Sequence, residues 1–242
     1  MKKLLLIYIY LFSVLLSMAQ EAEKPYDFPV KPGTSEWSKL KNNKEKVGVC
    51  QIPDNQLKLL STKDLLETCL NYPLLGDIMA FSNIQDGFNK FKNDFNGINE
   101  LLQRKDASEI LIAKYKMKRP SDYDNNWTLV RKGKFSFEFS IIEIFISQKE
   151  IISQLDYLSK VILIKELLEK YYKKTDNIIF GSLSYTTSAF CIVRILESEN
   201  LIKDISNKKT KNNIVQFSKN GNNLDKETFT NIILFAEQIT NN

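Results

Sequence analysis

The chain contains no histidine, and this limits the chemistry that its sequence can support. Ser-His-Asp and Cys-His hydrolases need an imidazole base, and most zinc sites use histidine or several cysteines. The three cysteines, Cys50, Cys69 and Cys191, show no CxxC spacing. We therefore expect no catalytic zinc, no other bound metal and no cofactor.

Each cysteine lies among apolar residues, as in the run Ala189-Phe190-Cys191-Ile192-Val193. Because a free cysteine commonly behaves as a small buried hydrophobe, the sequence favours three buried thiols. In an oxidising compartment a disulfide between Cys50 and Cys69 is the alternative, and it is the less favoured of the two.

Two further patterns resemble functional motifs but have an ordinary explanation. Residues 122–126 carry oxygen ligands at alternate positions, as a calcium loop does. However, Trp127 and Gly133 stand where such a loop needs glycine and glutamate, so a turn-rich loop fits better. Two Ser-x-x-Lys matches begin at Ser38 and Ser206, in segments that do not look buried, whereas a neutral lysine base needs burial.

Paired carboxylates are the remaining motif that could support catalysis, because two such groups can flank a glycosidic bond. The pairs are Asp64/Glu67, Glu138/Glu143 and Glu166/Glu169. On helices these acids more often pair with lysines or face solvent. A carboxylate-dependent hydrolase, with Asp77, Asp106 or a glutamate as base, is therefore an alternative hypothesis.

One polar set stands out between the first helices. Tyr72 and Asp77 lie in a compact turn, and Arg104 and Asp106 border the helices that follow. We expect Arg104 to pair with Asp77 or Asp106 and to fasten the packing of these helices. The functional alternative is a polar-rimmed groove in which Trp37 and Tyr72 contact a ligand. The candidate binding residues are thus Trp37, Tyr72, Asp77, Arg104 and Asp106.

Hydrophobic spacing and capping residues predict helices along most of the chain. A series of short helices is expected from Thr34 to Lys118, the last of them at Ala107 to Met117 with Asp106 as its cap. Val161 to Tyr172 carries a wide apolar stripe, and Tyr185 to Glu199 is apolar almost all round, which makes it the candidate central helix.

Two segments are harder to assign. Phe135, Phe137 and Phe139 alternate as in a strand, so a small β-hairpin near 127–139 competes with a helix from about Glu138. Ile202 to Asn223 is rich in lysine and asparagine and weakly patterned, and we expect it to be the most mobile segment.

The sum is a mostly α protein, built as an irregular multi-helix bundle or an α-α superhelix. An extended N-terminal lead over 20–34 precedes a single helical domain over 35–240. Its subregions, 35–118 and 135–240, are joined by a polar loop over 119–134.

Residues 1–19 have the three parts of an export signal. Two lysines precede an apolar run from Leu4 to Leu16, and Ser17-Met18-Ala19 supplies the small residues that a signal peptidase inspects. We expect cleavage before Gln20, no transmembrane segment afterwards, and export to the periplasm, the cell surface or the medium. An uncleaved N-terminal anchor is the alternative.

The positive charge is modest and comes mostly from lysine. The net charge is +5, and the chain has four arginines, at positions 104, 119, 131 and 194. Proteins that read nucleic acid rely on arginine for bidentate contacts, so we expect no nucleic-acid partner.

Several short stretches resemble a group of uncharacterised bacterial exported proteins. They are Tyr26-Asp27-Phe28-Pro29-Val30-Lys31-Pro32-Gly33-Thr34 with Glu36-Trp37, Cys50-Gln51-Ile52-Pro53, Leu70 to Asp77, and Phe95-Asn96-Gly97 with Leu101, Arg104 and Asp106. The resemblance covers residues 26–117 and implies export and a helical body, but no activity.

The sequence thus predicts an exported helical protein that binds another protein or a component of the cell envelope without catalysing a reaction. The carboxylate-dependent hydrolase and a structural component of an envelope assembly are the alternatives. Convergent acids in one pocket would favour the enzyme, whereas an open groove would favour the binding protein.

Overall fold

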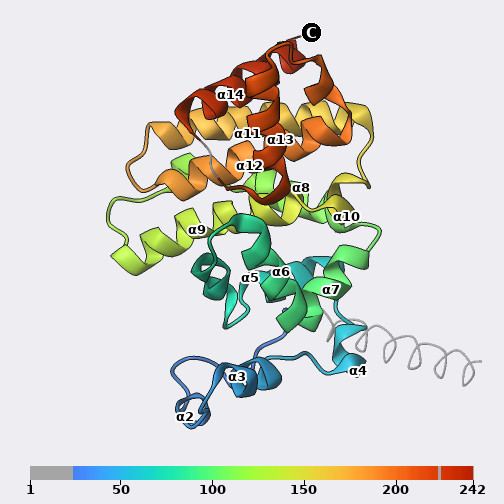
Figure 1. The fold of residues 1–242 in the computed structure, drawn as a ribbon. Helices are drawn as coiled ribbons and strands as arrows, with labels where there is room; N and C mark the ends of the chain where they lie inside the picture. The colour runs from blue at the N-terminus through green and yellow to red at the C-terminus, as the bar shows by residue number, and fades with distance from the viewer. Residues whose placement is uncertain (1–23, 223–224, 242) are drawn as a thin grey trace, which may run out of the picture.

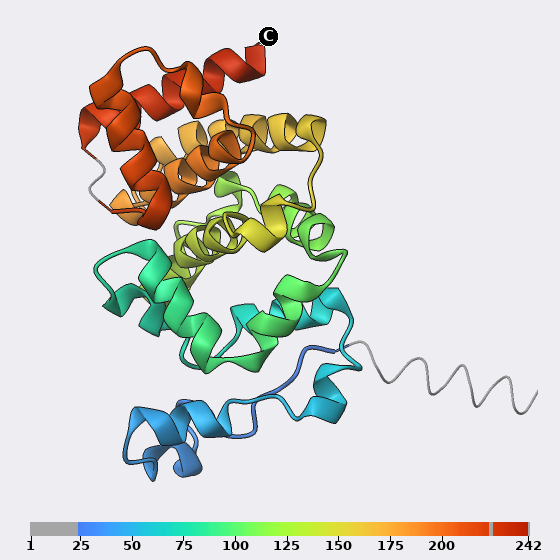
Figure 2. The ribbon, with the colours of Figure 1, turned by 45° about the vertical axis from the view of Figure 1, so that its right-hand side comes forward.

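In the computed structural model the helices are stacked roughly in chain order along the long axis of the molecule (Figures 1 and 2). The structure describes residues 24–222 and 225–241, and these contain helices but no strand. The predicted mostly α multi-helix fold is confirmed. The predicted export signal lies outside the described residues.

The N-terminal half consists of short helices, as the sequence predicts. They are α2 (Ser35–Ser38), α3 (Asn43–Val49), α4 (Asp54–Leu57), α5 (Thr62–Leu70), the 3₁₀ helix η1 (Leu75–Ala80), α6 (Ile84–Asp94), α7 (Asn96–Gln103), α8 (Ala107–Met117) and η2 (Pro120–Asp122). Side chains cap several of these helices: Thr34, Asn42, Ser61 and Asn83 each accept a hydrogen bond from a backbone N–H in the first turn.

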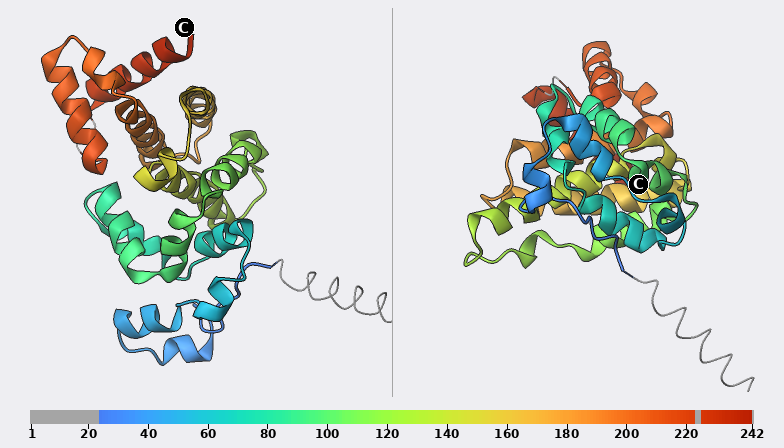
Figure 3. Two further views of the ribbon diagram at one scale, coloured as in Figure 1. Left: turned by 90° about the vertical axis from the view of Figure 1, so that its right-hand side faces the viewer. Right: turned by 90° about the horizontal axis from the view of Figure 1, so that it is seen from below.

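The C-terminal half contains the longer helices. They are α9 (Leu129–Ile146), α10 (Lys149–Ile152), α11 (Tyr157–Thr175), α12 (Ser182–Ser198), η3 (Leu201–Asp204), α13 (Lys208–Asn220) and α14 (Lys226–Asn241). The two views of Figure 3 show how this half covers one end of the N-terminal helices.

Residues 25–28 of the N-terminal lead lie in an extended conformation against the body. The Tyr26 N–H donates to Thr68 Oγ1 at 2.9 Å. Phe28 is 3% exposed, and its ring meets those of Tyr72 and Phe95, each with a centroid distance of 5.9 Å. Burial of this ring anchors the lead to the core.

The β-hairpin considered for residues 127–139 is not formed, because α9 occupies this segment from Leu129 onwards. Thr128 caps the helix by accepting from the Arg131 N–H, so the polar loop ends at Thr128 and not at residue 134. Phe135 and Phe139, one helical turn apart, both contact Phe180. Tertiary packing therefore selects the helical period over the alternating one.

Helix α12 is the centre of the C-terminal half, as the sequence predicts, and it packs against α9, α11, α13 and α14. Its buried residues lie on every side of the helix. The described part of the Lys- and Asn-rich segment, residues 202–222, contains most of η3 and the whole of α13. Ile214 and Phe217 of α13 are buried, and the Phe217 ring meets Phe190 of α12.

Candidate functional site

A buried ion pair and its hydrogen bonds join the four helices α8, α9, α11 and α12. Glu143 of α9 accepts hydrogen bonds at Oε1 from Lys174 Nζ of α11 (2.5 Å) and from Tyr115 Oη of α8 (2.7 Å). Ser188 Oγ of α12 also donates to Oε1 at 2.9 Å, and Thr187 Oγ1 donates to Oε2 at 2.7 Å. We call these five residues the Glu143 cluster.

The Glu143 cluster brings serine, lysine and glutamate together, as a hydrolytic site would. Lys174 Nζ lies 3.1 Å from Ser188 Oγ. However, every member of the cluster has an exposed fraction of 0%, and Glu143 accepts three hydrogen bonds at Oε1 and one at Oε2. Burial and the neighbouring Glu143 raise the pKa of Tyr115 well above its usual value. With no route for a substrate, the cluster fastens the core.

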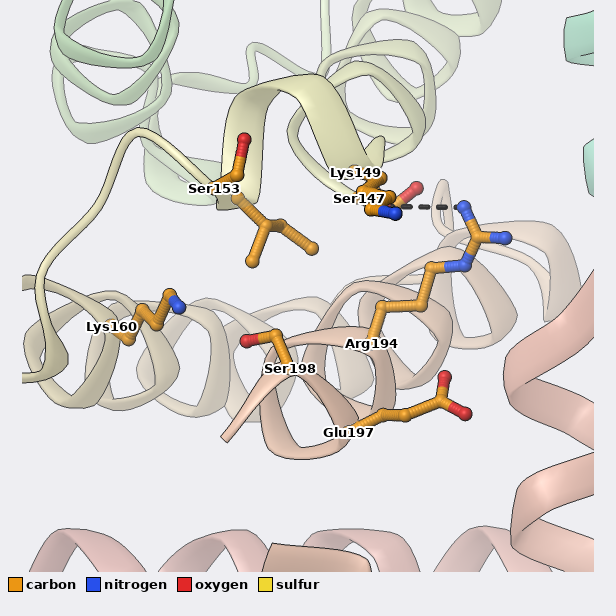
Figure 4. A pocket seen from close by; sticks show the side chains of 8 residues that line it. Ser147, Lys149, Ser153, Lys160, Arg194, Glu197 and Ser198 are labelled. Atoms are coloured by element: carbon orange, nitrogen blue, oxygen red, sulfur yellow. Dashed lines mark hydrogen bonds between the residues drawn. The ribbon is translucent and has the colours of Figure 1, made fainter. Parts of the chain in front are cut away.

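A cavity of about 470 Å³ opens where α9, α10, α11 and α12 meet (Figure 4). We call it the α9–α12 cavity. It lies at the end of α9, along α10, and beside the beginning of α11 and the end of α12. Its lining consists of cations, hydroxyls, one acid and one aliphatic side chain: Ser147, Lys149, Ile152, Ser153, Lys160, Arg194, Glu197 and Ser198.

The three cations of this cavity differ in how far they are already engaged. Lys160 is 7% exposed and pairs with Glu199 at 2.5 Å. Arg194 donates to the carbonyl oxygens of Ser147, Ser218 and Lys219 at 2.9–3.2 Å, which leaves two of its five N–H groups for a ligand. Lys149 is exposed and has no ion pair among the described residues.

Desolvation by burial lowers the pKa of Arg194, while the charges of Glu197 and other anionic groups raise it. A guanidinium remains protonated in proteins, so Arg194 is a fixed cation in the cavity wall. Figure 4 shows its side chain reaching to Ser147, with Glu197 one turn further along α12. The two positive charges of Lys149 and Arg194 therefore exceed the one negative charge of Glu197 in the cavity lining.

Two exposed serine hydroxyls offer acceptors to the cavity. Ser153 donates its proton to the Glu150 carbonyl oxygen (3.2 Å) and Ser198 to that of Ile195 (2.7 Å), whereas Ser147 is fully buried and its hydroxyl oxygen already accepts from Gln148. A hydroxyl whose proton is committed still offers oxygen lone pairs. The cavity thus presents cations for an anion and oxygen acceptors for ligand hydroxyls.

A second cavity, of about 360 Å³, lies between α5, α8 and α9. Its acids, Glu67 and Glu138, converge on Lys114 at 2.6 and 3.6 Å. Burial alone would lower the pKa of Lys114, but the hydrogen bonds and charges of the two glutamates outweigh this and raise it. The ammonium stays charged between the two carboxylates, and Glu138 also pairs with Lys118 at 3.1 Å, so both acids are engaged by lysines.

The other acids of the predicted carboxylate pairs are also engaged. Glu166 pairs with Lys170 and Glu169 with Lys173, both at i,i+4 spacing on α11. Asp64 accepts from the hydroxyl of Ser61. The acids therefore serve helix capping and ion pairing, as expected of acids on helices.

The candidate binding residues do not converge on one cavity. Tyr72 and Asp77 both line a small space of about 10 Å³ that also borders Lys90 and Asp94. Tyr72 is 4% exposed and stacks on Phe95 at 4.2 Å, so its ring belongs to the core. Its hydroxyl is buried without a hydrogen-bond partner, and burial raises its pKa.

Arg104 is a fastener, as expected, but with partners other than those predicted. Its guanidinium pairs with Glu100 at 2.8 Å and reaches the carbonyl oxygen of Leu60 at 3.3 Å, instead of pairing with Asp77 or Asp106. Asp106 accepts from Thr62 Oγ1 at 2.8 Å. Trp37 belongs to α2, and Nζ of Lys46, in the neighbouring helix α3, lies 5.5 Å from the centroid of its ring. Neither of the two cavities of 470 and 360 Å³ is lined by Trp37, Arg104 or Asp106.

The cysteines are three free, buried thiols, and the Cys50–Cys69 disulfide is not formed. In the loop that resembles a calcium site, Asp122 Oδ2 accepts from the Arg119 N–H and Asp124 Oδ1 from the Asn126 N–H. Both carboxylates therefore stabilise turns. No group of acids or cysteines within residues 24–222 and 225–241 has the arrangement of a metal site.

Comparison of the chain with protein-family models, with curated proteins and with solved structures gave no match. Within the described ranges, no helix has both the length and the apolar character needed to span a membrane. The geometry of the α9–α12 cavity is therefore the guide to function.

Proposed function

We propose that the protein is an exported, non-catalytic binding protein whose α9–α12 cavity holds an anionic, hydroxyl-rich component of the cell envelope, such as an acidic sugar. The observation that carries the proposal is that cations line the same cavity as serine hydroxyls whose protons are donated to backbone carbonyl oxygens. A volume of about 470 Å³ lies in the range of small-molecule sites.

The anionic group of the ligand is assigned to Lys149 and Arg194, because both keep N–H groups that no acceptor among the described residues uses. Ser153 and Ser198 would accept from the ligand hydroxyls, and Ile152 would contact an apolar face of a sugar ring. Electrostatic attraction to a fixed guanidinium favours an acid over its neutral analogue.

Binding is preferred to catalysis because the groups that a hydrolase would use are committed elsewhere. The cavity presents one acid, Glu197, and a glycosidase needs two. The convergent acids of the second cavity are bridged by Lys114. The serine beside a lysine, Ser188, is fully buried.

The test uses calorimetric titration with N-acetylmuramic acid, which carries a carboxylate, and N-acetylglucosamine, which does not. We expect saturable binding of the acid and binding of the neutral sugar that is about tenfold weaker or more, because a charge-assisted contact is lost. Lys149→Gln should weaken binding of the acid by about tenfold. Lys165→Gln, an exposed lysine of α11 away from the cavity, is the matched control and should change nothing.

Mass spectrometry after incubation with a disaccharide of the two sugars, which contains a glycosidic bond, completes the test. We expect the disaccharide to be recovered unchanged. Equal affinity for the two sugars, or equal effects of the two lysine variants, would contradict the proposed site. A chemically altered sugar would instead favour the carboxylate-dependent hydrolase.

A further inference from the structure

The four most exposed large apolar side chains of the described residues belong to three neighbouring segments. Their exposed fractions are 98% for Ile178, 84% for Leu129, 82% for Val130 and 79% for Met117. Met117 ends α8, Leu129 and Val130 begin α9, and Ile178 lies in the loop between α11 and α12. Figures 1 and 3 place the start of α9 and this loop at one edge of the molecule, with the start of α9 projecting outward.

Ring contacts join these segments into one structural unit. Phe135 of α9 meets Trp127 of the preceding loop at 5.1 Å and Phe180 of the α11–α12 loop at 6.3 Å. Lys118, which follows Met117, places its Nζ 4.1 Å from the Phe135 ring centroid. We call the surface formed by residues 116–134 and 176–180 the α9 edge.

Basic residues are concentrated at this edge. Residues 116–134 contain six basic and two acidic residues, and residues 176–180 add one acid, Asp176, so the edge carries a net charge of +3. The basic residues are Lys116, Lys118, Arg119, Arg131, Lys132 and Lys134. Arg131 is exposed and lies over the Trp127 ring at 4.2 Å, so the exposed apolar pair of α9 is flanked by a positioned cation.

We propose that the α9 edge docks on a membrane surface rich in anionic lipids. Exposed aliphatic side chains at a projecting helix start can enter the headgroup layer, while the adjacent lysines and arginine meet lipid phosphates. Trp127 and Tyr123, half-buried beside them, have the amphipathic rings that favour a membrane–water interface. This inference concerns a surface separate from the α9–α12 cavity and does not rest on the proposed ligand.

Co-sedimentation with vesicles tests the proposal. The exported, processed chain is mixed with vesicles of phosphatidylcholine alone or with about one third phosphatidylglycerol, and every variant shares its N-terminus. We expect strong partition only into the anionic vesicles. Arg131→Gln/Lys132→Gln/Lys134→Gln should weaken partition by about a hundredfold, since each cation near the surface contributes about fivefold.

The apolar contribution is tested separately. Leu129→Ser/Val130→Ser should weaken partition by at least about tenfold, because two side chains no longer enter the headgroup layer. The matched control for this pair is Leu59→Ser, which removes a side chain with an exposed fraction of 74% from another part of the chain. Lys208→Gln/Lys209→Gln/Lys211→Gln is the matched charge control, since it removes three lysines from the start of α13. Both controls should leave partition unchanged.

Fluorescence provides a readout at the edge itself. The chain has two tryptophans, so a Trp37→Phe background leaves Trp127 as the reporter. Its emission should shift to shorter wavelength on addition of anionic vesicles. The proposal is overturned if the chain does not partition into anionic vesicles, if the control variants lose as much partition as the edge variants, or if Trp127 emission does not shift. Circular dichroism establishes that each variant is folded.

Discussion

Substitution of Glu143 by glutamine tests the Glu143 cluster most sharply. Glutamine keeps the size of the side chain and one carbonyl oxygen, but it removes the charge that balances Lys174. At the site of the carboxylate, Oε1 accepts from Tyr115, Lys174 and Ser188, and Oε2 accepts from Thr187. An amide NH₂ in place of either oxygen would face a donor.

The expected loss follows from the burial of both charges. Glu143 and Lys174 each have a side-chain exposure of 0%. Removing one partner of a buried ion pair leaves an uncompensated charge and typically costs about 3–5 kcal/mol. Because single domains are stable by about 5–15 kcal/mol, Glu143→Gln should remove about a fifth or more of the free energy of unfolding.

Urea denaturation followed by far-UV circular dichroism measures this loss. The matched control is Glu169→Gln, which breaks an ion pair on the exposed side of α11 and should cost less than about 1 kcal/mol. Adding Lys174→Met to Glu143→Gln should recover much of the stability, since the buried charge is then gone. A loss below about 1 kcal/mol for Glu143→Gln, or no recovery in the double variant, would refute the reasoning.

Three further predictions concern the core and the caps. Burial raises the pKa of the Cys69 and Cys191 thiols above 9.0, so above pH 9 the unfolded state releases protons that the folded state retains. Denaturation should therefore show stability falling by about 1 kcal/mol for each thiol between about pH 9 and pH 10, and the double alanine variant should flatten this slope. Gly87→Ala should cost about 1–3 kcal/mol in thermal or urea unfolding because its Cβ would collide with a backbone carbonyl of η1, whereas Gly48→Ala, whose Cβ meets open space, should gain about 0.5–1 kcal/mol. Thr128→Ala should cost α9 about 1 kcal/mol of capping and accelerate amide hydrogen exchange in its first turn, and unchanged exchange would contradict the assigned cap.

Local patterns were sufficient for much of the fold. Helix α8 begins and ends where the sequence predicts, and the apolar α12 is central, because the hydrophobic period acts within one segment. Asp106 precedes α8 as predicted, but its side chain makes no capping hydrogen bond. The hairpin hypothesis was wrong because alternation and helical period coincide at Phe135 and Phe139, and only Phe180, more than forty residues later, decides between them. For α13, the signal was present in Ile214 and Phe217 three residues apart, but the lysines and asparagines obscured it.

The candidate site was harder to predict than the fold. The i,i+4 pair of Glu100 and Arg104 was readable from spacing alone and was missed in favour of more distant acids. The Glu143 cluster was not readable, because Lys174 lies 31 residues and Ser188 45 residues from Glu143. The α9–α12 cavity depends in the same way on how four helices meet.

Binding of an acidic, hydroxyl-rich ligand in the α9–α12 cavity should change the environment of the backbone amides around the cavity. Amide chemical-shift mapping by NMR during titration with N-acetylmuramic acid measures this change. We expect saturable shifts clustered at residues 147–153 and 194–198, with little change at the α9 edge. Shifts scattered over the surface, or no shifts at these two segments at saturating sugar, would contradict it.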